Sequence, residues 1–380
     1  MPRPSRQGGG AAPRRAAPPR RRAGADQPRR PLARVPGRFA TIERLRRWLA
    51  ESRARTACWS QAGWQQRQSL EAVDLARLGL LPDEAAMRAA LRYPVKVPPY
   101  VLSLVDWDDP RDPIRLQWLP DGRELMRLCS DASDDPFGEA QQGPFPGMVH
   151  RFPDRVLLMV STCCATRCRH CTRKNRLDEA VALPPTARML AQVADYIRGA
   201  PGVREAILSG GDPLLLSDAR LLRWVDGLAR LPQIDAVRIG TRVPCTLPMR
   251  VTAPLARALG RSGKVWVNTQ FNHVREITPE SAQACRLLVE AGIPVSNQSV
   301  LLQGVNDSVE AMADLCRGLQ RIRVRPYYVF VCDPVTGTLH FRTPIAKARR
   351  IARELTEQIG GLLLPRFVVD QPGASAKQPI

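Results

Sequence analysis

Lysine is scarce in this chain, which has 52 arginines but only five lysines, at positions 96, 174, 264, 347 and 377. Arginine stays protonated and cannot form a Schiff base, so chemistry that needs a primary amine has few candidate residues here. Long apolar runs are missing too, because no segment approaches the roughly eighteen apolar residues of a membrane span. The sequence therefore predicts neither a membrane-spanning protein nor a membrane partner.

Acidic residues are nearly absent from residues 1–38, which hold eleven arginines and one acid, Asp26. This tail supplies about half of the net charge of +21 and is rich in proline, glycine and alanine. With almost no large apolar side chain to bury, it is expected to be disordered. Its charge leaves open the alternative that it binds RNA, a membrane surface or a protein, although nucleic acid is not the expected partner. No apolar stretch of an export signal follows the arginines, so a cytoplasmic protein is expected.

Three regions are predicted after the tail. Residues 39–150 contain helical segments and then, from 96 to 148, a stretch rich in proline and acids that predicts irregular covering structure. From 151 to 345, β-branched runs alternate with helix-length segments, which predicts parallel strands joined by right-handed crossovers. Residues 346–380 predict a C-terminal helix and a short segment that carries Lys377. The predicted strands are Val156–Ser161, Glu205–Ser209, Ala236–Gly240, Val265–Gln270, Val295–Leu301 and Pro326–Val331. The predicted helices are Ile42–Ala50, Trp64–Leu78, Pro82–Leu91, Pro184–Arg198, Asp218–Arg230, Pro254–Arg261, Pro279–Ala291 and Ser308–Leu319.

Six strand–helix alternations predict an α/β fold, a partial or complete β/α barrel of the (β/α)6 type, with a doubly wound sheet as the alternative. In a barrel, the residues that carry the chemistry lie on the loops that follow the strands. The cysteine-rich segment 163–171 follows the first predicted strand, Ser209 to Asp212 follows the second, and Cys332 and Asp333 follow the sixth. These loops are therefore the expected place of the site.

Ten cysteines without a secretory signal indicate a reducing compartment rather than a disulfide framework. Cys164, Cys168 and Cys171 have the spacing C-x3-C-x2-C. Three thiolates on one short loop can hold three irons of a four-iron cluster and leave the fourth iron open to a ligand. Zinc bound by these cysteines and His170 is one alternative, but a second ligand pair at zinc-finger spacing is missing. The other alternative is that these are ordinary core cysteines, but the residues between them are mostly polar or basic, which argues against a core position.

A cysteine loop of this spacing after the first strand of a β/α barrel resembles that of the radical S-adenosylmethionine (SAM) superfamily, in which the open iron binds SAM. The turn from Ser209 to Asp212 resembles the superfamily's glycine-rich turn. Residues 149–380 resemble the lysine 2,3-aminomutase family almost continuously. The resembling stretches are His150–Arg155, Cys168–Arg173, Ile207–Pro213, Arg238–Arg242, Phe271–His273, Ile293–Gln298, Arg325–Tyr328, His340–Pro344 and Phe367–Asp370.

The resemblance implies a radical SAM barrel with three cofactors: a [4Fe–4S] cluster, SAM and pyridoxal 5′-phosphate. It implies that Cys164, Cys168 and Cys171 hold the cluster. Lys377 lies in a loop of small residues like the one that delivers the family's Schiff-base lysine, and only four other lysines compete for this role. Further cofactor-binding residues implied by the resemblance are Ser209, Gly210, Gly211, Asp212 and Gln298.

Charged residues at five positions resemble those of the family's cofactor and substrate sites. Arg151 and Arg155 align with arginines at the pyridoxal phosphate site, where a phosphate favours guanidinium partners. Arg173 aligns with the arginine that grips the substrate carboxylate. Asp333 and Asp370 align with two aspartates that hold the side-chain ammonium of lysine, and a buried cation needs such fixed anions. The resemblance therefore implies a cationic amino acid substrate, lysine first and arginine second.

The implied activity is that of an isomerase that converts L-lysine to β-lysine. The alternatives are an aminomutase acting on arginine or another amino acid, the branch that supplies β-lysine to modify elongation factor P, and a basic RNA-binding protein with a structural metal. Gln270 stands where the family has a histidine, and Phe330 where it has a tyrosine. Reduced flavodoxin or ferredoxin is implied as the electron donor. A homodimer is compatible with the resemblance, although the sequence ends before a segment that fuller members use in assembly.

Overall fold

Short β-branched segments associate in sequence order in the computed structural model. Over the described part of the chain, nine strands form one sheet in the order β1 to β9. The neighbours from β2 to β8 are parallel, whereas β1 and β9 add antiparallel edges. A doubly wound sheet would reverse its strand order, so that alternative is wrong and the partial barrel is confirmed. The strands are β1 (Met148–Phe152), β2 (Arg155–Ser161), β3 (Glu205–Gly210), β4 (Ala236–Gly240), β5 (Val265–Thr269), β6 (Val295–Leu301), β7 (Arg325–Val331), β8 (Arg366–Val369) and β9 (Gln378–Pro379).

The described residues all fall within the unit Pro36–Ile380. The arginine-rich tail lies outside them, so its predicted disorder stays a prediction. The structure describes residues 41–81, 83–126, 132–178, 180–371, 373–374 and 376–380.

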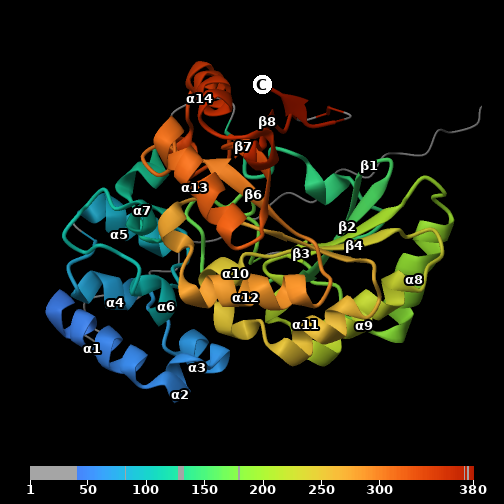
Figure 1. The fold of residues 1–380 in the computed structure, drawn as a ribbon, viewed down its shortest axis with the longest axis horizontal. Coiled ribbons are helices and arrows are strands. Elements are labelled where there is room, and N and C mark those ends of the chain that lie inside the picture. Colours follow the sequence, from blue (N-terminus) through green and yellow to red (C-terminus); the bar gives the residue numbers. More distant parts are fainter. Residues whose placement is uncertain (1–40, 82, 127–131, 179, 372, 375) are drawn as a thin grey trace, which may run out of the picture. The chain divides into compact units, whose positions relative to one another are not determined.

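Helices connect the parallel strands and bury one apolar face each. Threonine or serine caps the N-terminus of several of these helices. Thr186, Thr252 and Ser308 each accept a hydrogen bond from the backbone N–H three residues further along the chain. In Figure 1, α8, α9, α11 and α12 follow one another along one side of the strands. The helices of this region are α8 (Ala187–Arg198), α9 (Asp218–Ala229), α10 (Val243–Thr246), α11 (Ala253–Gly260), α12 (Pro279–Glu290), α13 (Val309–Arg321) and α14 (Ile345–Gln358).

The region before β1 consists of short helices with a hydrophobic cluster of their own. It is tied to the barrel by polar contacts, such as the 2.6 Å hydrogen bond between the hydroxyls of Tyr100 and Thr278. Its helices are α1 (Ile42–Ala54), α2 (Thr56–Trp59), α3 (Ala62–Arg67), α4 (Ala72–Arg77), α5 (Glu84–Arg92), α6 (Pro99–Leu102) and α7 (Pro113–Trp118). The 3₁₀ turns among the described residues are η2 (Gly122–Leu125), η3 (Glu139–Gln141), η4 (Pro213–Leu215), η5 (Pro248–Arg250), η6 (Val274–Glu276), η7 (Leu339–Phe341) and η8 (Gly361–Leu363).

The helix expected over Trp64–Leu78 is divided into α3 and α4. Between them Leu70 pairs with Val97 as an isolated β-bridge, which takes the backbone out of the helix. Helix α4 then begins at a capping box in which Glu71 and Asp74 each bond the other's backbone N–H. A tertiary pairing thus overrides the helical pattern of the sequence.

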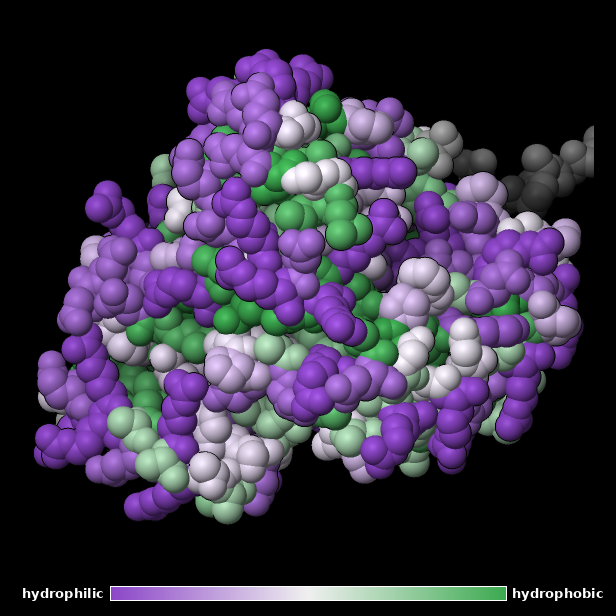
Figure 2. Space-filling model, in the orientation of Figure 1, coloured by the Kyte–Doolittle hydropathy of each residue, from purple (hydrophilic) through white to green (hydrophobic). Residues whose placement is uncertain are grey.

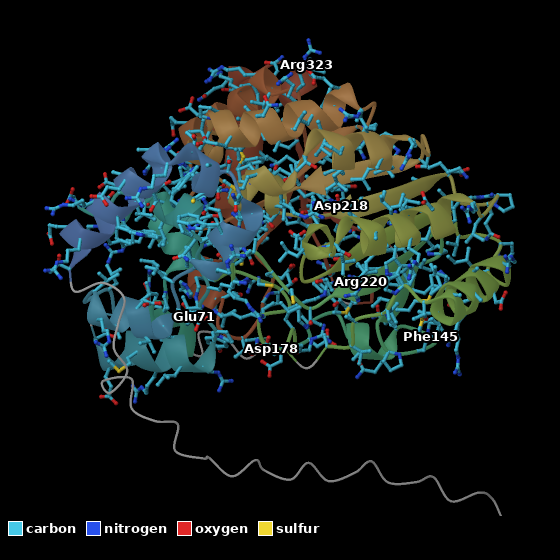
Figure 3. All side chains as sticks on the ribbon, turned by 90° about the horizontal axis from the view of Figure 1, so that it is seen from below. Glu71, Phe145, Asp178, Asp218, Arg220 and Arg323 are labelled. Atoms are coloured by element: carbon cyan, nitrogen blue, oxygen red, sulfur yellow. The ribbon has the colours of Figure 1, made fainter. Side chains whose placement is uncertain are left out.

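Charged side chains surround the barrel. Figure 2 shows a face dominated by hydrophilic residues, with hydrophobic ones visible mainly in the depressions between them. Figure 3 labels Arg323, which has a positive φ of 57° and lies two residues after the last residue of α13. Among the described residues, no helix is long and apolar enough to cross a membrane.

Candidate active site

A cavity of about 1010 Å³ lies inside the partial barrel. It is lined by side chains from the cysteine loop, from the turn after β3, from β6 and β7, and from the C-terminal segment. The structure thus brings every predicted site residue to one place, while the role of each stays a prediction. These residues are Arg151, Arg155, Cys164, Cys168, Cys171, Arg173, Ser209, Gly210, Gly211, Asp212, Gln298, Asp333, Asp370 and Lys377.

The turn after β3 packs directly on the cysteine loop. A Cβ at Gly210, whose φ is +117°, would lie 2.2 Å from the carbonyl oxygen of Ser161, and one at Gly211 would lie 2.3 Å from that of Cys163. The N–H of Gly211 donates to Ser161 O at 2.6 Å, and that of Asp212 donates to Cys163 O at 2.7 Å. Both positions therefore require glycine, because the backbone of the turn touches that of the cysteine loop and leaves no room for a Cβ.

The Asp212 carboxylate joins the turn after β3 to the end of β4. It accepts the Thr241 hydroxyl at 2.7 Å and the Arg242 and Leu214 backbone N–H groups at 2.8 and 3.0 Å. Burial raises the pKa of Asp212 to about 6, although these donors act in the opposite direction. The position of the turn therefore depends on this side chain.

The three predicted cluster ligands are free thiols with N–H donors next to two of them. Cys168 Sγ lies 3.2 Å from Arg242 Nη1, and Cys171 Sγ lies 3.3 Å from the backbone N of Arg173. Burial raises the pKa of Cys164 and Cys171, so their thiolates need a compensating positive charge, which irons would supply.

This donor set fits a thiolate-ligated cluster. Over the described residues, no three His, Cys, Asp or Glu side chains are grouped so that they could hold a single metal ion. Ligands to different irons of a cluster need not converge on one point.

Two buried residues lie beside the cysteines: Arg242, which was not predicted as a site residue, and His170, which was named only as a ligand in the zinc alternative. Arg242 donates to Gln117 Oε1 at 2.6 Å and to Glu276 Oε1 at 2.9 Å, in addition to its contact with Cys168. Burial holds the pKa of His170 well below its ordinary value, so this imidazole is neutral. Both residues lie in stretches that resemble the family, but their partners lie as many as 125 positions away, as Gln117 does from Arg242.

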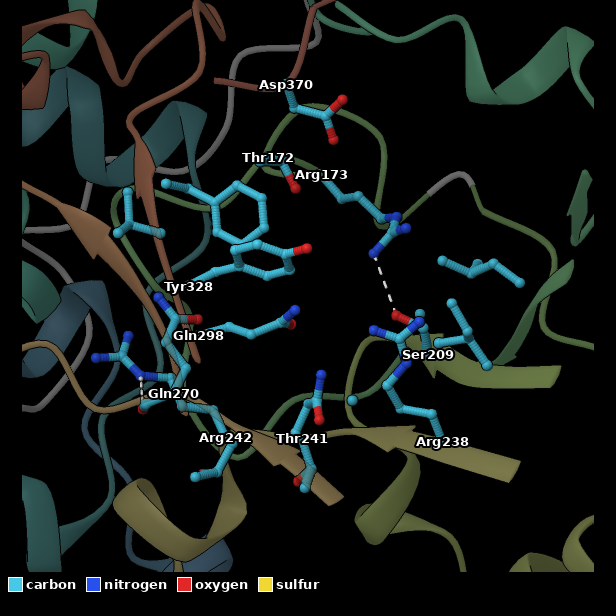
Figure 4. A pocket seen from close by; sticks show the side chains of 18 of the residues that line it. Thr172, Arg173, Ser209, Arg238, Thr241, Arg242, Gln270, Gln298, Tyr328 and Asp370 are labelled. Carbon is cyan, nitrogen blue, oxygen red and sulfur yellow. Dashed lines mark hydrogen bonds between the residues drawn. The ribbon is translucent and has the colours of Figure 1, made fainter. Parts of the chain in front are cut away.

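Arg173 reaches into the cavity, as Figure 4 shows. Its Nη1 lies 3.4 Å from the Ser209 hydroxyl, and its Nε and Nη2 donate to the two carboxylate oxygens of Glu139 at 2.9 and 2.7 Å. Glu139 lies in η3, within the stretch expected only to cover the barrel, and no sequence motif indicated it.

Lys377 lies among aromatic rings and charged groups. Its Nζ is 5.0 Å from the centre of the Phe152 ring, 5.5 Å from that of Phe330 and 3.8 Å from Asp370 Oδ2. Burial lowers the pKa of Lys377, Asp370 opposes this effect, and nearby arginines add to it. A lowered pKa favours the neutral amine, the form that attacks a carbonyl.

Arg151 is shared between two acceptors of the C-terminal segment. Its Nη2 lies 2.8 Å from Asp370 Oδ1 and donates to the Gln371 carbonyl oxygen at 2.5 Å, while its buried Nε has no hydrogen-bond partner among the described residues. The Arg155 guanidinium lies 4.5 Å from the centre of the Phe152 ring. An unpartnered buried N–H beside Lys377 fits a ligand with anionic oxygens, such as a phosphate.

Asp333 lies at the end of β7 and faces the same cavity. Within the described residues, its carboxylate makes no hydrogen bond and no ion pair. Burial and the nearby Asp370 raise its pKa to about 7. The cations beside this pair of carboxylates, Arg151 and Lys377, both contact Asp370 rather than Asp333.

Comparison with known proteins agrees with this architecture. Residues 158–316 match the model of the radical SAM superfamily, so the fold and the cysteine loop define a radical SAM enzyme. The chain is 43% identical over 328 residues to L-lysine 2,3-aminomutase of Clostridium subterminale, covering 85% of this chain and 78% of that protein. It is 43% identical over 326 residues to L-lysine 2,3-aminomutase of Acetoanaerobium sticklandii, with coverage of 85% and 78%. The glutamate 2,3-aminomutase of Clostridioides difficile is 35% identical over 326 residues, with coverage of 85% and 76%.

The chain therefore belongs to the lysine 2,3-aminomutase family. It is a radical SAM aminomutase, and thus an isomerase. Membership implies a [4Fe–4S] cluster, SAM and pyridoxal phosphate as its cofactors.

Proposed function

We propose that this aminomutase moves the α-amino group of L-lysine to the β-carbon and so produces β-lysine. The observation that carries the proposal is the buried pair Asp333 and Asp370 in the cavity that also holds Arg173. Arg173 would bind the substrate carboxylate, and the two aspartates would bind the ammonium at the other end of the side chain. An apolar chain between two charged ends needs charges of opposite sign at both ends of its site.

The electrostatics of Asp333 favour a cationic substrate over an acidic one. Its pKa is raised to about 7 because it is buried and lies near Asp370. A bound ammonium would offset both effects, whereas the side chain of glutamate would add a third carboxylate. Lysine is therefore the first candidate, and arginine, which also carries a cation, is the second.

Lys377, Arg151 and Arg155 would hold pyridoxal phosphate. Lys377 supplies an amine whose lowered pKa favours its neutral form, and Arg151 supplies a buried Nε that has no partner within the part of the chain that the structure describes. Pyridoxal phosphate, when bound, supplies a carbonyl for the substrate amine and a conjugated system that can spread an unpaired spin. Phe152 and Phe330, which flank the Lys377 amine, shield it from water.

Cys164, Cys168 and Cys171 would hold the cluster, with Arg242 donating to one sulfur. Cluster and SAM together supply a carbon-centred radical that can take a hydrogen atom from the substrate. Ser209 to Asp212 and Gln298, which line the same cavity as the cysteines, would bind SAM. Reduced flavodoxin or ferredoxin is the electron donor that we propose.

Incubation of the reduced, cofactor-loaded enzyme with lysine, arginine and glutamate separately tests the substrate. We expect β-lysine from lysine and no β-amino acid from glutamate. Turnover of arginine alone would make arginine the substrate, and turnover of glutamate with none of lysine would refute the role of the aspartate pair. Borohydride reduction followed by peptide mass analysis tests the lysine independently of turnover, because the pyridoxyl group should be found on Lys377.

A further inference from the structure

Glu139 binds one edge of the Arg173 guanidinium. Its Oε2 accepts from Nε at 2.9 Å and its Oε1 from Nη2 at 2.7 Å, which is a bidentate arrangement. Both side chains are largely buried, with 15% of Arg173 and 16% of Glu139 exposed. Glu139 comes from η3, before the barrel begins, so the predicted carboxylate clamp depends on a residue from the covering region.

The guanidinium retains a second edge for another ligand. Arginine has five N–H donors, of which this pairing uses one on Nε and one on Nη2. The remaining donors lie on Nη1 and on the other side of Nη2, and together they can bind a second carboxylate. Nη1 points toward the cavity and lies 3.4 Å from the Ser209 hydroxyl (Figure 4).

Glu139 is itself held in place by its surroundings. Arg176 donates to Glu139 Oε2 at 3.0 Å and also binds Asp135, whose Oδ1 accepts the backbone N–H of Glu139 at 3.1 Å. Burial alone would raise the pKa of Glu139, but Arg173 and Arg176 lower it, so it is an anion at neutral pH. Two acids and two guanidiniums therefore form a charge-balanced cluster on the Nε edge of Arg173.

We propose that Glu139 is the positioning residue of the carboxylate clamp: it holds the Nε edge of Arg173 and so presents the opposite edge to the carboxylate of the amino acid substrate. The inference rests on the proposed role of Arg173. A free arginine side chain loses rotamer entropy when it binds a ligand, and Glu139 removes that freedom before the substrate arrives. The opposite interpretation is that Glu139 imitates the substrate carboxylate and competes with it.

Binding of L-lysine and L-lysinamide to the anaerobic, unreduced holoenzyme tests the proposal. Both ligands carry the same two amines, but the amide lacks the carboxylate, so the ratio of their affinities measures the clamp alone. Calorimetric titration would compare the wild type with Glu139→Gln and Glu139→Ala. The matched control is Asp135→Asn, which removes one negative charge from the same cluster but from a residue that binds Arg176. Iron content and the spectrum of bound pyridoxal phosphate check that each variant retains its site.

The wild type should prefer lysine, and Glu139→Ala should reduce that preference at least about tenfold, the effect of one charge-assisted hydrogen bond. Affinity for lysinamide should change little. Glu139→Gln retains one acceptor, so its preference for lysine over lysinamide should lie between those of the wild type and Glu139→Ala. If the alanine variant loses its cofactors, the glutamine variant serves as the test of the proposal. Asp135→Asn should keep the wild-type ratio.

Three results would overturn the inference: an unchanged preference in both Glu139 variants, an equal loss in Asp135→Asn, or tighter lysine binding without Glu139, as competition requires. A wild type that binds lysine no better than lysinamide would instead refute the proposed function. The two failures are therefore distinguishable.

Discussion

Replacement of Asp333 by asparagine removes one carboxylate of the buried pair and preserves the size of the side chain. In the folded enzyme, burial and the proximity of Asp370 raise the pKa of Asp333 to about 7 from its ordinary 3.8. Between these two pH values the folded protein holds a proton on Asp333 that the unfolded chain releases. The folded enzyme should therefore lose stability as the pH rises through this window, because its unfolded state binds fewer protons.

The size of the effect follows from the difference between the two pKa values. One pKa unit corresponds to about 1.4 kcal/mol. Protonation of Asp333 therefore adds at most about 4 kcal/mol to the free energy of unfolding of the wild type, and this amount is lost across the whole window. Asparagine carries no such proton. From pH 5 to pH 8 the stability advantage of Asp333→Asn over the wild type should therefore grow by about 2–3 kcal/mol.

Urea unfolding of the cofactor-free protein at pH 5 and pH 8 measures this change. Asp226→Asn, at an exposed position of α9, is the control and should show a difference from the wild type that does not vary with pH. A constant gap between Asp333→Asn and the wild type would refute the reasoning, since it would mean that Asp333 ionises in the folded protein as it does in water. Affinity for lysine should fall in the same variant, because the substrate ammonium would lose one of its anions.

Three further outcomes follow from other parts of the site. Gly211→Ala should cost about 1–3 kcal/mol in urea unfolding and lower the iron content, because its Cβ would lie 2.3 Å from Cys163 O. Gly360→Ala, with no atom within 4 Å of its Cβ, should do neither. Arg242→Gln should lower the reduction potential of the cluster by up to about 100 mV in an EPR-monitored titration, because a cationic donor to a thiolate favours the reduced state. Arg238→Gln, on β4, which ends two residues before Arg242, should leave the potential unchanged. Lys377→Ala should lose the borohydride-trapped pyridoxyl group and retain its iron, and retention of the label would refute its assignment.

Most of the barrel could be predicted from the sequence because its strands and helices are encoded locally. The six predicted strands correspond to β2 to β7, whose β-branched residues lie between capped helices. Strands β1, β8 and β9 were missed. The last two have four and two residues and exist because each pairs with a neighbouring strand, a contact that no short window of sequence contains.

The predicted site residues share one cavity, yet their partners could not be read from the sequence. Glu139 and Arg173 are 34 positions apart, and Arg242 and Cys168 are 74 apart. A charged residue in an irregular segment has many potential partners, and only packing selects one. The pairing of Arg151 with Asp370 is of the same kind, since each was predicted to serve a different ligand.

Three features could be read directly from the sequence: the spacing of three cysteines on one loop, the small set of lysines that can form a Schiff base, and the order of strands and helices in the barrel. These are properties of composition and of neighbours along the chain. Tertiary packing selects the carboxylate that holds Arg173 and the guanidinium that reaches Cys168. Packing also places Asp333 near Asp370, where it forms no ion pair among the described residues. Distances of a few ångströms and the exclusion of water decide the energies of charged groups, and both arise only when distant segments pack together.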